Sequence, residues 1–221
     1  MKVILIGATG MVGQGVLREC LRAQDVAGVL VVGRTSLGKL NPKLKELLQP
    51  DLFTLSRVRE QLSGYDACFF CLGVSSAGMS EGQYGHLTYD LTLGIAELLA
   101  ELNPDMVFTY VSGAGTDSSA QGRSMWARIK GRTENELLRL PFKAAYMFRP
   151  GLIQPLHGIR SKTRAYRLFY RLTSPLLPLL RRMFPDQILT TEQMGRAMLT
   201  AVRNGAPKSI LESADIRAIA L

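Results

Sequence analysis

The stretch VILIGATGMVG, residues 3–13, decides the fold of this 221-residue chain. Four aliphatic residues, Val3–Ile6, predict a buried strand, and three glycines follow them at intervals of three, at Gly7, Gly10 and Gly13. Helical spacing of apolar residues then predicts a helix over Gly13–Ala23. The segment is therefore expected to be a strand, a glycine turn and a helix.

Such a turn is suited to binding a dinucleotide. The first glycine allows the tight turn, the second lets the backbone approach a pyrophosphate, and the third lets the helix pack closely on the strand. The helix N-terminus offers free N–H groups and the positive end of its dipole to the anion. A purely structural turn is the alternative interpretation.

Outside this segment, apolar runs alternate with amphipathic stretches. Runs that are apolar along their whole length predict strands buried on both faces, as in a parallel sheet covered by helices. We expect a doubly wound α/β fold in one domain, residues 1–221. Strands are expected at Val29–Val32, Ala67–Leu72, Met106–Val111, Ala144–Phe148 and Ser209–Leu211, helices at Val58–Leu62, Leu87–Leu102, Ser124–Leu140, Leu168–Met183 and Glu192–Asn204, and either at Leu40–Leu48.

Composition excludes several classes of protein. Hydrophobic residues make up 47% and charged residues 20%, which excludes a disordered chain. No uncharged apolar run reaches the ~18 residues of a spanning helix. Three cysteines, an odd number with Cys68 and Cys71 inside an apolar run, favour reduced thiols in a cytoplasmic protein. No Cys/His cluster has metal spacing, so no metal is expected.

The net charge of +9 is local. Residues 137–185 contain ten of the 27 basic residues and none of the 18 acidic ones. Residues from about 153 to 186 also interrupt the strand–helix alternation, so we expect a basic lid over the carboxyl edge of the sheet. Such a lid favours a phosphate- or carboxylate-bearing substrate. An anionic membrane surface, or a leucine-lined homodimer surface beside a solvated helix, are alternatives, and nucleic acid is not expected.

The end of the second strand bears on cofactor choice. An NAD site usually has an acidic residue here for the ribose hydroxyl, whereas this chain has Arg34 and Ser36. An arginine with neighbouring hydroxyls fits a 2′-phosphate. NADP(H) is therefore preferred over NAD(H), unless Arg34 is an ordinary surface residue.

Several motifs together resemble the short-chain dehydrogenase/reductase superfamily, in its atypical and extended branches. They are GATGMVG at 7–13, CLG at 71–73, VSGAG at 111–115, KG at 130–131 with Glu134 and Glu136, and FRPG at 148–151. The resemblance covers nearly the whole chain and is greatest to Tat-interacting-protein-like oxidoreductases and their small bacterial relatives.

The resemblance implies a set of cofactor contacts. The whole turn would contact the pyrophosphate, and Lys130 would hold the nicotinamide ribose. The further contacts it implies are Thr9, Met11 and Val12 in the turn, Asp51 near the adenine, Leu72 and Gly73 along the ribose and pyrophosphate, and Arg149, Pro150, Gly151 and Ile153 beside the nicotinamide.

The implied reaction centre departs from the family pattern. The superfamily uses Tyr-x-x-x-Lys after the fifth strand, with a serine that steadies the substrate. Lys130 and Ser112 match, but Trp126 stands in the tyrosine position. An indole N–H cannot act as a general acid near neutral pH. Another acid could be Tyr84, Tyr89 or Tyr110, or Trp126 could shape a different reaction, or simply anchor its helix.

Three kinds of function follow from these expectations. The first is an NADP(H)-dependent oxidoreductase, or an epimerase- or dehydratase-like enzyme, that acts on a small and anionic substrate. The second is an NADP(H)-binding redox-sensing or regulatory protein without turnover. A peripheral membrane protein is the third reading.

Overall fold

A parallel sheet of seven strands forms the centre of the computed structural model, which describes residues 1–159, 182–183 and 186–220. All neighbouring strands pair in parallel, in the order β3-β2-β1-β4-β5-β6-β9. The order reverses between β1 and β4, where doubly wound sheets open a crevice at the carboxyl ends of the strands. The strands are β1 (Lys2–Ile6), β2 (Gly28–Gly33), β3 (Leu44–Leu48), β4 (Ala67–Phe70), β5 (Val107–Val111), β6 (Ala144–Arg149) and β9 (Ile210–Glu212).

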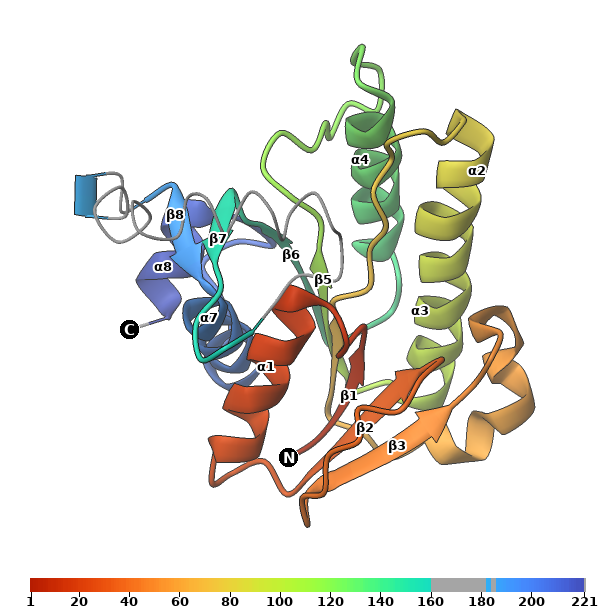
Figure 1. Ribbon diagram of the computed structural model, residues 1–221. Helices are drawn as coiled ribbons and strands as arrows, with labels where there is room; N and C mark the ends of the chain where they lie inside the picture. Colours follow the sequence, from red (N-terminus) through yellow and green to blue (C-terminus); the bar gives the residue numbers. More distant parts are fainter. Residues whose placement is uncertain (160–181, 184–185, 221) are drawn as a thin grey trace.

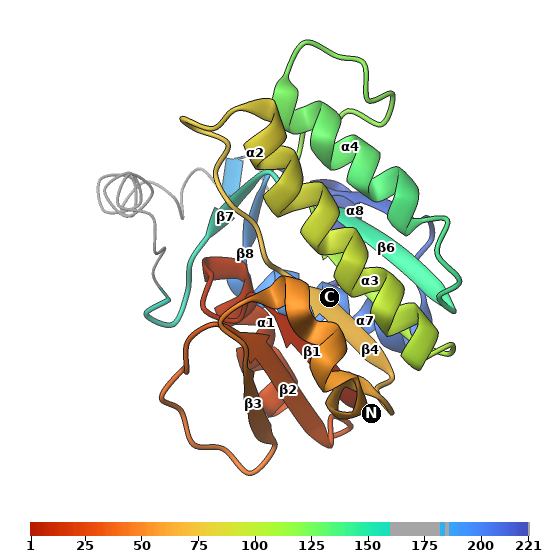
Figure 2. The ribbon, with the colours of Figure 1, turned by 90° about the vertical axis from the view of Figure 1, so that its right-hand side faces the viewer.

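Helices cover both faces of this sheet (Figure 1). Helices α1, α7 and α8 lie on one face, and α3 and α4 run side by side over the other (Figure 2). The helical elements are α1 (Met11–Arg22), a 3-10 helix η1 (Leu52–Leu62), α2 (Glu81–Gly85), a π-helical turn η2 (His86–Asp90), α3 (Leu91–Leu102), α4 (Met125–Leu137), α7 (Thr191–Asn204) and α8 (Ser213–Ile219). The predicted single-domain, doubly wound fold is confirmed.

Two hydrophobic cores explain why the strands are apolar throughout. Successive strand residues point to opposite faces. Leu5 and Phe69 belong to the core under α1 and α7, whereas Ile4 and Phe70 belong to the core under α3 and α4. All four side chains are at most 1% exposed, so both faces of β1 and β4 are buried.

Some boundaries differ from the expected ones for local reasons. The helix expected at Leu87 begins earlier, because Ser80 and Gln83 form a capping box before α2. The ambiguous stretch Leu40–Leu48 forms the edge strand β3 only in its second half, where it pairs with β2. Helix α1 begins at Met11, inside the glycine motif, with Gly10 as its N-cap.

A small second sheet and helix α8 are additions to the expected fold. Strands β7 (Leu152–Gln154) and β8 (Ile188–Thr190) pair in parallel beside the carboxyl edge. The helix expected over Leu168–Met183 and most of the basic lid lie outside the described residues. None of the helices in the described part of the chain combines the length and apolar content needed to cross a membrane.

Candidate functional site

The carboxyl ends of β1, β2 and β4 surround an open cavity of about 350 Å³ at the point where the strand order reverses. Three features predicted from the sequence meet here: the glycine turn, Arg34 after β2 and Leu72 after Cys71. The lining residues are Gly7, Ala8, Thr9, Val31, Val32, Gly33, Arg34, Thr35, Leu52 and Leu72.

Contacts made by the glycine turn explain its spacing. Gly7 has a φ of +87°, and an added Cβ there would lie 2.5 Å from the Leu72 nitrogen. A Cβ on Gly13 would lie 2.2 Å from the Gly7 carbonyl oxygen, so helix and turn pack backbone against backbone. Gly10 is the N-cap, and no side chain caps the start of α1. The first N–H groups of α1, from Met11 onward, are therefore left for an anionic ligand.

The loop after β2 carries the groups expected near a 2′-phosphate. Arg34 is exposed and lines the cavity. The hydroxyl of Ser36 donates to Glu46 of β3 at 2.6 Å, so it serves the loop itself. Thr35, Ser36 and Lys39 line an adjoining hollow of about 230 Å³. Lys39 was not singled out by the sequence, because only the course of the loop brings it beside the glycine turn.

Asp51 lies at the rim of the cavity and is the N-cap residue of η1. Its carboxylate accepts a hydrogen bond from the Phe53 nitrogen at 3.0 Å and so caps η1. The next residue, Leu52, lines the cavity. The acid predicted near an adenine is therefore next to the cavity and held in place by the helix that it caps.

Lys130 reaches from α4 to the end of β5. Its Nζ donates to the Ser112 carbonyl oxygen at 2.7 Å and lies 3.4 Å from that of Val111. The Tyr110 ring centre is 5.6 Å away. Burial lowers the pKa of Lys130 to about 8, and the nearby Glu134 carboxylate acts in the opposite direction. The ammonium is therefore held by two backbone oxygens, and its pKa lies closer to neutral pH than that of an exposed lysine.

Ser112 is tied into a buried ion pair that sequence reasoning missed. Its hydroxyl donates to the carboxylate of Glu134, which is 0% exposed. The Arg149 Nε lies 3.1 Å from both oxygens of that carboxylate. Arg149 also donates to Ser118 at 2.6 Å and contacts Glu212 at 3.3 Å. The hydroxyl expected to steady a substrate is thus engaged inside the protein.

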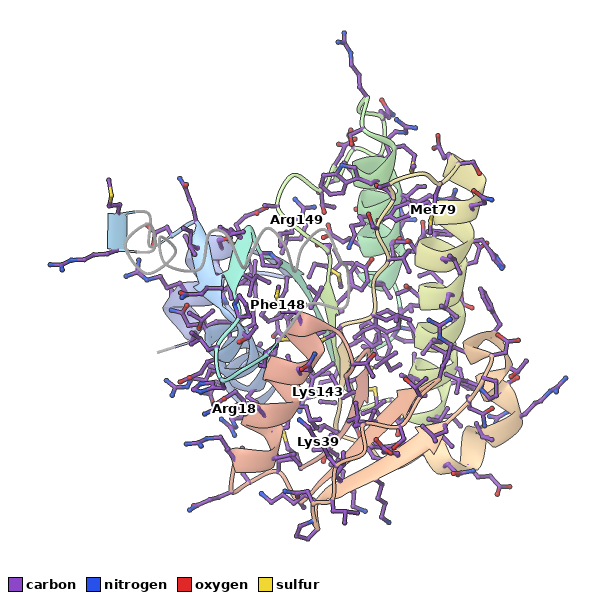
Figure 3. All side chains as sticks on the ribbon, in the orientation of Figure 1. Arg18, Lys39, Met79, Lys143, Phe148 and Arg149 are labelled. Carbon is purple, nitrogen blue, oxygen red and sulfur yellow. The ribbon has the colours of Figure 1, made fainter. Side chains whose placement is uncertain are left out.

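Arg149, which the resemblance places beside a nicotinamide, uses its side chain for contacts inside the protein. It lies at the carboxyl end of the sheet, beside the segment that follows β5 (Figure 3). Its guanidinium contacts Glu134, Ser118 and Glu212. Two features of the sequence could have indicated this buried ion pair: the single arginine that ends the otherwise uncharged strand β6, and a glutamate on the buried face of α4.

Trp126 is half-buried and packs on the loop after β5. A Cβ on Gly115 would lie 3.6 Å from its indole ring. The alternative tyrosines Tyr84 and Tyr110 are at most 2% exposed, and burial raises the pKa of both phenols. Tyr89 faces the Arg132 guanidinium at 4.1 Å. Tyr84 and Tyr110 are thus enclosed in the core, away from any substrate.

A larger cavity of about 590 Å³ opens at the ends of β5, β6 and β9. Gly151 forms part of its wall, with its N–H donating to Ser213 at 2.8 Å, while Ile153 is buried in the core. The Pro150 carbonyl accepts from the Ala114 nitrogen at 2.9 Å and ties this wall to the loop after β5. The lining residues are Ala114, Gly151, Leu152, Asp186, Gln187, Ile188, Glu212, Ser213 and Ala214.

Comparison with known sequences finds distant relatives of this chain. No family model matches the chain. The rat protein HTATIP2 is 27% identical over 153 residues, which cover 68% of this chain and 62% of the rat protein. The mitochondrial protein FMP52 of Saccharomyces cerevisiae is 27% identical over 179 residues, covering 80% of this chain and 74% of that protein. The match thus spans less than two thirds of the rat relative.

Solved structures share the fold. A short-chain dehydrogenase/reductase from Saccharomyces cerevisiae has a TM-score of 0.70 at 12% identity, covering 99% of this chain and 97% of that one. The Bordetella bronchiseptica enzyme WbmG, solved in complex with NAD, has a TM-score of 0.68 at 12% identity, covering 96% and 71%. The predicted resemblance to short-chain dehydrogenases/reductases is confirmed, and at these identities the solved structures establish the fold.

Proposed function

We propose that this chain binds NADP(H) and transfers a hydride between it and a small carbonyl or hydroxyl substrate. The observation that carries the proposal is that the glycine turn, Arg34 and Leu72 line one cavity at the switch point of the sheet. The turn leads directly into the uncapped start of α1. Lys130 stands at the end of β5 on the other side of that switch point. The neighbouring structure solved with NAD supports a nicotinamide cofactor.

Each part of the cofactor has a candidate partner in this chain. The N–H groups at Met11–Gly13 would bind the pyrophosphate, and Arg34 with Lys39 would bind the 2′-phosphate. Lys130 would hold the nicotinamide ribose, and the backbone at 149–153 would lie along the ring. When bound, the nicotinamide supplies or accepts the hydride. The chain's own residues bind and orient both molecules.

The substrate would occupy the cavity of about 590 Å³, which shares the loop after β5 with Lys130. Among the described residues that line it, the charged ones are Asp186 and Glu212, both acidic. The preference for an anionic substrate therefore rests on the basic segment alone, which lies outside the described residues.

We expect NADPH to bind more tightly than NADH, because only NADPH carries the phosphate that Arg34 would bind. Titration with each nucleotide, followed by energy transfer from Trp126, the only tryptophan, measures both Kd values. Arg34→Met should raise the NADPH Kd by about 10-fold or more, since hydrogen bonds to charged groups are worth about 1.5–3 kcal/mol. The NADH Kd should stay within about twofold.

A matched control for this change is Arg139→Met. Arg139 follows α4 near the amino end of β6, where it pairs with Glu136 at 2.7 Å, so both Kd values should be unchanged. NADH binding as tightly as NADPH would contradict the 2′-phosphate role of Arg34.

The second candidate is nucleotide binding without turnover. Two observations favour it: Trp126 replaces the tyrosine, and the Ser112 hydroxyl is engaged by Glu134. A protein of this kind would bind NADPH and leave it unoxidised with every aldehyde and ketone offered. Trp126→Tyr would then place a phenol one helical turn before Lys130, and a gain of carbonyl reduction in that variant alone would favour this candidate over the enzyme.

A further inference from the structure

We propose that Lys130 itself donates the proton to the substrate oxygen, in place of the tyrosine that Trp126 has replaced. The inference rests on the proposed function, because it concerns the same reaction. It assigns to Lys130 proton transfer in addition to the ribose contact described above.

The other polar side chains near the end of β5 are poorly suited to donate a proton to a substrate. The Trp126 indole does not titrate near neutral pH. The Ser112 hydroxyl donates to a carboxylate that is 0% exposed, and Tyr110 is 1% exposed. Within the described residues around the end of β5, Lys130 is the titratable group that is both half-buried and directed at the carboxyl edge of the sheet.

The geometry around Nζ also suits proton donation. An ammonium has three N–H donors. Nζ lies 2.7 Å from the Ser112 carbonyl oxygen and 3.4 Å from the Val111 carbonyl oxygen, so these two acceptors take two of the donors. These two backbone oxygens hold the nitrogen in place and leave a third hydrogen for a substrate oxygen. Val111 is the last residue of β5 and Ser112 begins the loop after it, and Ala114 of the same loop lines the substrate cavity.

The charges that face Lys130 come from a small number of elements. On its own helix, Glu134 lies one turn further along and favours the ammonium, although its carboxylate is shared with Arg149 from β6. On β5, the buried ring of Tyr110 faces Nζ at 5.6 Å. Burial outweighs the single carboxylate and lowers the pKa of Lys130 to about 8. A donor whose pKa is near the working pH transfers protons effectively.

The proposed step balances as a carbonyl reduction. The substrate carbon accepts a hydride, with both electrons, from the reduced nicotinamide, and the C=O π bond breaks. The substrate oxygen takes one proton from the Lys130 ammonium. Lys130 is left as a neutral amine and regains a proton from water. In the reverse direction, the neutral amine removes the hydroxyl proton.

The decisive variant is Lys130→Arg. A guanidinium keeps the positive charge that would hold the ribose, but its very high pKa prevents it from releasing a proton near neutral pH. NADPH binding should therefore stay within about threefold, while kcat for reduction of 4-nitrobenzaldehyde and a panel of aldehydes and ketones falls by about 100-fold or more. Lys130→Met, which loses the positive charge as well, should weaken NADPH binding and also lower kcat.

The pH dependence provides an independent test. Reduction needs the ammonium, so wild-type kcat should be constant at low pH and fall about tenfold per pH unit above the pKa of Lys130. In the protein labelled with ¹³C at lysine Cε, the resonance missing from Lys130→Arg should titrate near pH 8. Lys143→Arg is the matched control, because Lys143 lies at the opposite end of the sheet from Arg149 (Figure 3).

Different failures are distinguishable. If wild type binds NADPH but reduces no member of the panel, the proposed function fails and this inference fails with it. If wild type turns over and Lys130→Arg keeps kcat within threefold with the same pH profile, only the role of Lys130 is wrong. A Lys130 resonance that stays protonated up to pH 10 would also overturn it.

Discussion

Gly13→Ala should raise the Kd for NADPH by at least ~100-fold, a loss of about 2.7 kcal/mol of binding free energy. The added Cβ would lie 2.2 Å from the Gly7 carbonyl oxygen and 2.8 Å from its carbon. Both atoms are backbone, so no side-chain rotation can relieve the clash. Helix α1 would have to move away from the turn, and its N–H groups would lose their alignment with a pyrophosphate.

A matched control separates this local effect from a general one. Gly94→Ala makes the same change inside helix α3, where a Cβ would meet nothing within 4 Å. It should leave the Kd unchanged and stabilise the protein by roughly 0.5–1 kcal/mol, because alanine is the better helix former. Fluorescence titration and urea unfolding measure the two quantities. A folded Gly13→Ala protein with wild-type affinity would show that the anion is bound elsewhere.

The second large effect is expected from Arg149→Met. It leaves the Glu134 carboxylate, which is 0% exposed, without its cation. Breaking a buried ion pair on one side typically costs about 3–5 kcal/mol, because the remaining charge has lost its compensation. We therefore expect a loss of that order in the free energy of unfolding, measured by urea denaturation at pH 7.

An exposed ion pair provides the comparison. Arg59 contacts Glu101 at 2.6 Å, with side chains that are 49% and 62% exposed. Arg59→Met should cost at most about 1 kcal/mol, because water screens the pair. The double variant Arg149→Met with Glu134→Gln should be more stable than Arg149→Met alone, since it removes the stranded charge. Equal losses in Arg149→Met and Arg59→Met would show that the buried pair contributes little.

Local sequence patterns predicted the elements whose consecutive residues are all buried. Val3–Ile6, before the glycine turn, are buried on both faces of the sheet, so all four are apolar. In contrast, Leu40–Leu48 contains lysine, glutamate and leucine, which suit helices as well as strands. Its second half is a strand because the edge of β2 provides its hydrogen-bond partners. The three-residue strands β7 and β8 have no periodicity of their own to detect.

The sequence by itself predicted the doubly wound fold and the glycine turn, because runs of apolar residues and the spacing of glycines are local patterns. Only the tertiary structure decided how the Ser112 hydroxyl is used. Its partner Glu134 is 22 residues away, and Arg149 is 15 further on, and the three meet because β5 and β6 are neighbours under α4. A buried charge has to find a partner in space, and the folded chain alone brings that partner within reach.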